Sequence, residues 1–175
     1  MKKNIAFIGF MGSGKSTISK VLSKKFDMNL IDTDDYIVEK NNQSISDMFD
    51  TYGEEYFRDK ETEAIKEISK LKDTIISCGG GAVLRDINVE YIKENGAIVL
   101  LKATPETIYE RVKYSTDRPI LNGNMNVEFI KGLMDKRKDR YESVADIVID
   151  TDNKSINDIV DEIAEKIVEK YSIVL

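Results

Sequence analysis

Several residue types that often carry out chemistry are missing or scarce in this chain of 175 residues. It has no histidine, which excludes the most common general base, the most common zinc ligand and any serine–histidine–aspartate triad. Acid–base chemistry must therefore depend on carboxylates. The single cysteine, Cys78, cannot form a disulfide within the chain, and this favours a reducing compartment. We therefore expect a cytoplasmic protein.

Long hydrophobic runs and an excess of basic residues are also lacking. No stretch is apolar over the length that a membrane-spanning helix requires. The net charge is −6 and the isoelectric point is about 4.9, which argues against nucleic acid or an anionic membrane as the main partner. An anionic substrate would need a local cluster of basic side chains. With only two prolines, no repeat and no Gly/Ser-rich linker, residues 1–175 are predicted to form one domain. We expect a monomer, because no obvious apolar interface stripe remains unassigned.

Short apolar runs alternate along the chain with amphipathic stretches of helical period. Several runs are apolar at consecutive positions, as expected for parallel strands that are covered on both faces. Helical patterns occupy 15–26, 54–71 and 157–171, and Thr104-Pro105 is typical of a helix start. The alternation predicts an α/β fold, a three-layer α/β/α sandwich around a five-stranded parallel sheet. The expected strands are residues 5–9, 29–31, 74–78, 97–101 and 146–149.

One segment, residues 113–126, interrupts this alternation. It is polar and contains Arg118-Pro119 and a Gly123-Asn124 pair between two helical stretches. Long polar loops in compact domains often act as lids over a site, so we predict a mobile lid here. A plain surface connection is the alternative.

The strongest motif runs from Gly9 to Thr17 with the sequence GFMGSGKST. It matches G-x-x-x-x-G-K-[ST] between an apolar strand and a helix, the context of a phosphate-binding loop (P-loop). Its glycines let the backbone curl so that N–H groups point at a phosphate, and the helix adds the positive end of its dipole. Lys15 can reach the β and γ phosphates, and the Ser16 hydroxyl can take a Mg²⁺ position. The motif predicts a P-loop NTPase fold that binds a nucleoside triphosphate; a chance glycine-rich turn is the alternative.

The nucleotide is predicted to be ATP rather than GTP. The nearest match to the guanine-binding N-K-x-D motif, residues 153–156, lacks the aspartate. A D-x-x-G sequence occurs at residues 50–53, but it follows a polar helical stretch and not a strand. A GTPase switch is therefore not expected.

Two carboxylates follow the second expected strand. Residues at the carboxyl ends of strands in a doubly wound sheet face the ligand crevice, and alternation along an extended chain would place Asp32 and Asp34 on the same side. One carboxylate can hold Mg²⁺ through water, while the other accepts a hydrogen bond from an acceptor hydroxyl. Capping of the next helix by Asp34 or Asp35 is the alternative, and both roles can hold.

Two further features suit an acidic acceptor. Arg58 lies near the start of a long helix, and arginine is the residue best able to bind a carboxylate through two hydrogen bonds. A solvated helix face is the alternative for Arg58. Gly79 to Gly81 end the third strand and permit close approach of the backbone to a ligand, or else form an unusual turn. Cys78 is expected to be a small core residue, not a nucleophile.

These motifs occur in order and at compatible spacing over nearly the whole chain. They are the P-loop, Asp32-Thr33-Asp34, Phe57-Arg58 with Glu61, Gly79-Gly80-Gly81, Arg118-Pro119, and Arg137 with Tyr141. As a set they resemble the shikimate kinase family. Residues 137–141 read RKDRY where the family usually has R-x-P-L-Y, so Lys136 and Arg140 remain alternatives to Arg137.

The resemblance implies ATP-dependent phosphorylation of the 3-hydroxyl of shikimate, a small anionic metabolite, in aromatic amino-acid biosynthesis. It implies catalytic roles for Lys15, Asp34 and Arg118, with Arg118 closing from the lid over the transferred phosphate. Mg²⁺ would be bound through Ser16 and, by way of water, Asp32. The implied ATP site comprises Gly12, Ser13, Gly14, Lys15, Ser16, Thr17, Arg111, Arg118, Asp152 and Asn153. The implied shikimate site, partly on a helical segment of about residues 34–62, comprises Asp34, Phe49, Phe57, Arg58, Glu61, Gly79, Gly80, Gly81 and Arg137.

Other functions remain as alternatives. A kinase for a different hydroxy acid, such as gluconate, would share the P-loop. A nucleoside monophosphate kinase would need a base pocket and phosphate-binding arginines, which Asp34 beside the glycines does not suit. A regulatory ATPase or binding module would use ATP without any acceptor. For Phe49 and Phe57, plain core packing is the alternative to contact with a substrate ring.

Overall fold

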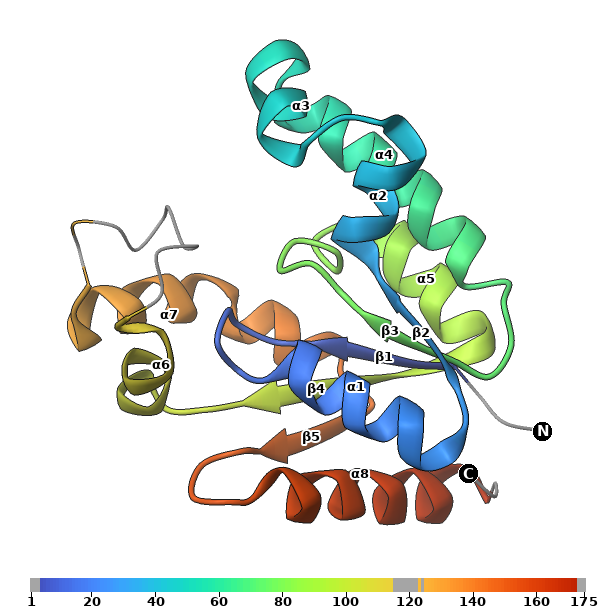
Figure 1. The fold of residues 1–175 in the computed structure, drawn as a ribbon, viewed down its shortest axis with the longest axis vertical. Coiled ribbons are helices and arrows are strands. Elements are labelled where there is room, and N and C mark those ends of the chain that lie inside the picture. The colour runs from blue at the N-terminus through green and yellow to red at the C-terminus, as the bar shows by residue number, and fades with distance from the viewer. Residues whose placement is uncertain (1–3, 115–122, 124, 173–175) are drawn as a thin grey trace.

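Five parallel strands form the centre of the structure (Figure 1). The computed structural model describes residues 4–114, 123 and 125–172. The strands lie in the order β2-β3-β1-β4-β5, and every neighbouring pair is parallel. The predicted fold is therefore confirmed. The strands are β1 (Asn4–Ile8), β2 (Asn29–Asp32), β3 (Thr74–Ser77), β4 (Gly96–Lys102) and β5 (Ile147–Asp150).

Helices cover both faces of the sheet and complete the three layers. On one face, α1 (Lys15–Phe26) and α8 (Ile156–Tyr171) pack against each other and the strands. On the other face lie α4 (Glu54–Ile68), α5 (Asp86–Asn95) and α7 (Val127–Val144). A sheet covered in this way leaves its carboxyl edge as the natural place for a ligand.

Strand β1 is apolar throughout because both of its faces are buried. Ile5 and Phe7 belong to the hydrophobic cluster formed with α1 and α8, whereas Ala6 and Ile8 belong to the cluster on the opposite face. Side chains alternate along a strand, so a strand between two helical layers needs apolar residues at consecutive positions. This accounts for the unbroken apolar run that identified the strand.

The connection from β2 to β3 forms a lobe that projects beyond the sheet (Figure 1). It consists of α2 (Thr33–Asn41), α3 (Ile45–Tyr52) and α4, which pack on one another. Ser44 begins α3 because its side chain accepts the backbone N–H of Asp47. The predicted helical segment of about residues 34–62 falls in this lobe.

The start of α2 differs from the sequence-based expectation. The N-cap is Asp32, not Asp34 or Asp35: its Oδ1 accepts the N–H of Asp34 at 3.0 Å and of Asp35 at 3.3 Å. Since the strand ends at Asp32 and the helix begins at Thr33, strand alternation does not relate Asp32 to Asp34. Both side chains nevertheless line the same cavity. The reason is that Asp32 caps α2 and Asp34 lies in the first turn of that helix.

Helix α6 (Pro105–Val112) begins as predicted, with Thr104 as N-cap and Pro105 at the first position. It packs with α7 and Phe10 around a small separate hydrophobic cluster. Residues 115–122 and 124 lie outside the described residues, and so does most of the predicted lid, Arg118 included. In the described part of the chain, no helix has both the length and the apolar character needed to cross a bilayer.

The topology explains where a site can form. After β1 the chain crosses to α1 on one face, whereas after β3 it crosses to α5 on the opposite face, and β1 and β3 are neighbours. Such a reversal opens a crevice beyond the carboxyl ends of the two strands. The P-loop and the Gly79–Gly81 turn begin at those two ends.

Candidate active site

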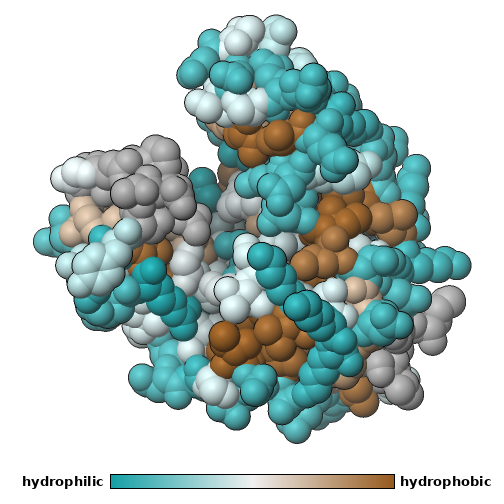
Figure 2. Space-filling model, in the orientation of Figure 1, coloured by the Kyte–Doolittle hydropathy of each residue, from teal (hydrophilic) through white to brown (hydrophobic). Residues whose placement is uncertain are grey.

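A cavity of about 720 Å³ lies at this edge of the sheet. Figure 2 shows the surface hollowed between the α2–α4 lobe and the part of the molecule formed by α6 and α7. Two predicted residues, Asp152 and Asn153, do not line the cavity, and Arg118 lies outside the described residues. The predicted residues that do line it are Gly12, Ser13, Gly14, Lys15, Ser16, Thr17, Asp32, Asp34, Phe49, Phe57, Arg58, Glu61, Gly79, Gly80, Gly81, Arg111 and Arg137.

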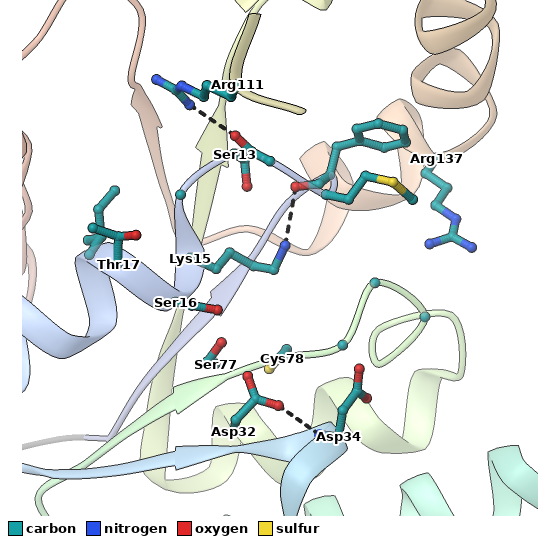
Figure 3. A pocket seen from close by; sticks show the side chains of 18 of the residues that line it. Ser13, Lys15, Ser16, Thr17, Asp32, Asp34, Ser77, Cys78, Arg111 and Arg137 are labelled. Carbon is teal, nitrogen blue, oxygen red and sulfur yellow. Dashed lines mark hydrogen bonds between the residues drawn. The ribbon is translucent and has the colours of Figure 1, made fainter. Parts of the chain in front are cut away.

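The P-loop leaves its donors available for an anion. Gly12 and Gly14 have φ angles of 77° and 101°, a region that glycine adopts at little cost. Helix α1 has no side-chain cap and no acidic residue in its first turn, so its N-terminal N–H groups and its dipole favour a phosphate. Lys15 Nζ donates to the carbonyls of Gly9 at 2.8 Å and Phe10 at 3.2 Å, which holds the ammonium over the loop (Figure 3).

Arg111 joins the P-loop to the connection after β5. Its guanidinium donates to the carbonyl of Gly12 at 3.2 Å, to Thr151 Oγ1 at 3.2 Å and to the Thr151 carbonyl at 3.3 Å. The side chain is thus fixed at the nucleotide end of the cavity. Asp152 turns away, because its carboxylate accepts the N–H of Thr104.

A cluster of oxygen ligands lies beside the P-loop. The Ser16 hydroxyl, the Asp32 carboxylate and the Ser77 side chain line the same side of the cavity (Figure 3). The described residues contain no group of three or more His, Cys, Asp or Glu arranged to hold a metal. Oxygen-only donors with room for water and phosphate nevertheless suit Mg²⁺, which commonly binds through one or two carboxylates and substrate phosphates. The residues present therefore fit a nucleotide-bound Mg²⁺.

Asp34 is a carboxyl group with an altered proton affinity. Burial, followed by the nearby charges of Asp32 and Glu61, raises its pKa from 3.8 to about 6, although Lys15 partly offsets this. A carboxylate with a raised pKa is a better proton acceptor than a fully solvated one. Asp34 points into the cavity from the start of α2, below the P-loop (Figure 3).

Arg58 is held by two carboxylates. Its Nη1 donates to Glu61 Oε2 at 2.8 Å, and its Nε and Nη2 lie 3.4 and 3.3 Å from Glu54 Oε1. Glu61 is only 1% exposed, and burial raises its pKa while Arg58 acts in the opposite direction. The guanidinium also lies 5.2 Å from the centre of the Phe57 ring. Arg58 is therefore positioned, and the alternative of a freely solvated helix face is wrong.

Only one of the three basic residues considered for α7 lines the main cavity, and it is Arg137. Arg140 Nε donates to the Val83 carbonyl at 2.6 Å, and its Nη2 pairs with Asp86 at 2.7 Å. Lys136 lines a separate hollow on another side of the helix. The ambiguity left by the sequence is therefore resolved in favour of Arg137 as the residue at the site.

The glycine run after β3 is explained by space and not by backbone conformation. None of Gly79, Gly80 and Gly81 has a positive φ. A Cβ on Gly79 would lie 2.5 Å from Asp34 Oδ1, one on Gly80 would lie 2.7 Å from Arg137 Nη1, and one on Gly81 would overlap the guanidinium of Arg58. Each glycine therefore makes room for a different charged side chain of the site.

This geometry yields a test. Gly81→Ala should weaken binding of an anionic substrate about tenfold or more, because the new methyl group displaces the Arg58 guanidinium. Some loss of stability should accompany it, because the displaced Nη1 of Arg58 is the atom that pairs with the buried Glu61. The control is Gly132→Ala in α7, where a Cβ meets no described atom within 4 Å apart from the adjacent residues and the nearby backbone of its own helix. Unchanged KM values for Gly81→Ala would contradict this role.

Apolar contacts complete the acceptor end. Phe49 and Phe57 line the cavity with ring centroids 4.9 Å apart, and Phe57 also belongs to the hydrophobic core, so the two interpretations of these aromatics are compatible. Ile45, one helical turn before Phe49, lines it as well. Cys78 is buried in the core and burial raises the pKa of its thiol, which agrees with the predicted structural role.

Several residues at the site had no role assigned from the sequence. Thr33 supports the glycine turn through its side chain. The helical spacing of Ile45 and Phe49 and the position of Ser77 before the glycines are the signals that the sequence contains for two of the others. The other residues that line the cavity without a predicted role are Ile18, Ile45, Ser77, Lys154, Ile156 and Ile159.

A loop built for a nucleoside triphosphate thus opens onto a cavity whose far end presents two guanidinium groups and a carboxyl group of raised pKa. This combination defines the class of a P-loop kinase that phosphorylates a small acidic molecule. Comparison with known proteins narrows the class. The family model described as shikimate kinase matches residues 11–169. The chain belongs to the shikimate kinase family.

Curated relatives match this chain over nearly its whole length. A curated shikimate kinase of Thermodesulfovibrio yellowstonii is 42% identical over 169 residues, which cover 97% of this chain and 95% of that protein. One from Dehalococcoides mccartyi is 40% identical over 170 residues, with 97% and 96% covered. Among solved structures, the shikimate kinase of Acinetobacter baumannii in complex with shikimate aligns with a TM-score of 0.87 at 28% identity, covering 98% of this chain and 96% of that one.

Proposed function

We propose that this chain transfers the terminal phosphoryl group of ATP to the 3-hydroxyl of shikimate, as a step of aromatic amino-acid biosynthesis. One observation carries the assignment of the acceptor. Arg58 from α4 and Arg137 from α7 both lie beside the Gly79–Gly81 turn, and both line the cavity that also contains Lys15. A carboxylic acid held by these guanidinium groups would share one cavity with the triphosphate site.

The acceptor end matches the chemistry of a small hydroxy acid. Arg58 and Arg137 would bind the carboxylate, each through a forked pair of N–H donors. Phe57 and Phe49 would pack against the apolar face of the ring. Glu61, paired with Arg58 at 2.8 Å, would hold that guanidinium in the orientation the carboxylate needs.

The remaining roles concern the transfer itself. Phosphoryl transfer has a loose transition state, so positioning and charge stabilisation contribute most. The P-loop amides and Lys15 bind the transferred phosphate, and Asp34 orients the acceptor hydroxyl and accepts its proton late in the reaction. Arg118, which the sequence assigns to the lid, would add a positive charge at the same phosphate.

Ser16 directly, and Asp32 through water, would hold the Mg²⁺ that accompanies ATP. Bound there, Mg²⁺ neutralises charge on the β and γ phosphates. The other predictions for the chain remain that it is cytoplasmic, monomeric and without nucleic-acid or membrane partners. Light scattering on the purified protein tests the oligomeric state.

The direct test offers ATP and a panel of hydroxy acids to the purified chain. ADP release should accelerate with shikimate but not with gluconate or nucleoside monophosphates, and the product should carry phosphate at the 3-position by ³¹P NMR. ADP release that is independent of every acceptor would instead indicate a regulatory ATPase. Turnover with gluconate in place of shikimate would assign the cavity to another acid.

The metal assignment has its own prediction. Chelation of divalent cations should abolish turnover, and added Mg²⁺ should restore it. Asp32→Asn should raise the Mg²⁺ concentration required for half-maximal activity by about tenfold or more, because a neutral amide replaces a charged outer ligand. Asparagine is an equally good N-cap, so α2 should keep its stability. Unaltered Mg²⁺ dependence in this variant would remove Asp32 from the metal site.

A further inference from the structure

Four of the six backbone polar groups of the Gly79–Gly81 turn are hydrogen-bonded. The Gly79 N–H donates to Thr33 Oγ1 at 2.8 Å, and the Tyr141 hydroxyl donates to the Gly80 carbonyl at 2.7 Å. The carbonyls of Gly79 and Gly81 accept from the amides of Ala82 and Leu84, both at 3.0 Å. In the described part of the chain, the N–H groups of Gly80 and Gly81 have no hydrogen-bond acceptor.

Thr33 occupies an unusual place in this arrangement. It is fully buried and is the first residue of α2, between Asp32 and Asp34. Its backbone is fixed by the Asp32 cap, which holds the next two N–H groups, while its side chain reaches a glycine 46 residues further along the chain. One residue therefore connects the carboxylate end of β2 to the turn that follows β3.

We propose that Thr33 is a positioning residue for the acceptor. Its hydroxyl oxygen accepts the hydrogen bond of the Gly79 N–H. The turn therefore presents only the N–H groups of Gly80 and Gly81 to the substrate hydroxyls. The inference rests on the proposed function, because it concerns the same cavity and the same substrate. Since a Cβ on Gly79 would lie 2.5 Å from Asp34 Oδ1, this hydrogen bond also sets how closely the turn packs against the Asp34 carboxyl group.

Thr33→Val separates this role from simple packing. Valine keeps the shape of threonine but offers no acceptor, so a buried amide loses its partner and the turn is free to shift. We expect KM for shikimate to rise about tenfold. KM for ATP should be unchanged, because the Thr33 side chain is hydrogen-bonded to the glycine turn and not to the P-loop. Thr33→Ser retains the hydroxyl, so its KM for shikimate should lie close to the wild-type value.

The matched control is Thr74→Val. Thr74 is also fully buried at a strand end, and its hydroxyl donates to the Lys72 carbonyl at 2.9 Å, but it lies at the opposite end of β3 from the site. A general loss of packing or stability should affect both variants alike. Only Thr33→Val should change KM for shikimate.

NMR gives a direct readout of the hydrogen bond. The chain has a single cysteine, Cys78, immediately before Gly79, so ¹³C-cysteine and ¹⁵N-glycine labelling identifies the Gly79 amide uniquely. This amide should exchange with solvent at least tenfold faster in Thr33→Val than in wild type. In the wild-type protein, shikimate should shift the amides of Gly80 and Gly81 more than that of Gly79.

The outcomes are separable. Equal Gly79 exchange in wild type and Thr33→Val, or an unchanged KM for shikimate in that variant, would overturn the role of Thr33 while leaving the proposed function standing. No glycine shift with shikimate in wild type would contradict the proposed function and this inference together. If Thr33→Val does not fold, the wild-type pattern still decides, because a Gly79 shift as large as those of Gly80 and Gly81 would show that its amide is not held by Thr33.

Discussion

Asp34→Asn should lower kcat with shikimate by about 10²–10⁴-fold while leaving ATP binding unchanged. Asparagine has nearly the same shape and can still accept a hydrogen bond, but it cannot take the proton of the acceptor hydroxyl. Since Asp34 lies below the P-loop and not within it, the phosphate contacts of ATP should persist. Steady-state kinetics together with fluorescence titration of ATP measures both quantities. Turnover near the wild-type value would contradict the role of Asp34.

The same substitution should stabilise the fold, which would show that the loss of activity does not come from misfolding. In the folded chain Asp34 has a pKa of about 6, above its ordinary value of 3.8, so the folded state binds this proton more tightly than the unfolded state. The associated stability is complete below the unfolded pKa and is lost as the pH rises through about 6. Above that pH, without metal or nucleotide, the free energy of unfolding of Asp34→Asn should exceed that of the wild type by at most about 3 kcal/mol. The variant should therefore unfold at a higher denaturant concentration. A less stable variant at pH 8 would contradict the cost of burying this charge.

Arg137→Met should raise KM for shikimate by a factor of about 30 to several thousand, equivalent to roughly 2–5 kcal/mol for losing one member of a buried charge pair. Methionine keeps much of the side-chain bulk but removes the charge and the donors. Arg137 is a cleaner choice than Arg58, because removing Arg58 would leave the buried Glu61 without its 2.8 Å partner and would destabilise the fold as well. KM for ATP should stay within about twofold, since Arg137 lies at the acceptor end of the cavity.

Lys136→Met is the matched control for this prediction. It removes a positive charge from the neighbouring position of α7, but that side chain lines a different hollow. General electrostatic attraction of an anionic substrate should change similarly in both variants, whereas direct contact is lost only in Arg137→Met. Equal effects of the two substitutions would show that Arg137 acts at long range and does not bind the carboxylate.

Local motifs made part of this site predictable from sequence. The P-loop is contiguous, and its function depends on glycine conformations and on the start of one helix, so the amino-acid pattern alone is enough to assign residues 12–17 to a phosphate site. The apolar runs predicted all five strands. The pattern is strongest in β1, β3 and β4, which are buried along nearly their whole length, whereas the edge strands β2 and β5 are partly exposed. In both cases the information lies within about ten consecutive residues.

Features that depend on contacts between distant segments were harder to predict from the sequence. Sequence spacing favoured Arg137 through its four-residue separation from Tyr141, but only the rotation of α7 against the sheet excludes Arg140 and Lys136. The orientation of Asp34 was expected for a reason that proved wrong, because the boundary between β2 and α2 falls at Asp32.

The glycine turn also depends on contacts between segments that are distant in the sequence. Its sequence indicated close approach, but the neighbours of each glycine come from α2, α4 and α7, which only the folded chain brings together. The role of Thr33 could not be seen for the same reason, since its partner is 46 residues away. Asp152 and Asn153 were assigned by resemblance alone, and the residues that line the cavity instead are Lys154 and Ile156, the first residue of α8.

One cavity should hold a triphosphate and a carboxylic acid facing each other. A crystal structure of the chain with shikimate and a non-hydrolysable ATP analogue tests this most directly. We expect the shikimate carboxylate between Arg58 and Arg137, with the 3-hydroxyl next to Asp34 and directed at the γ-phosphate. A carboxylate bound away from both arginines, or a 3-hydroxyl directed away from the nucleotide, would contradict it.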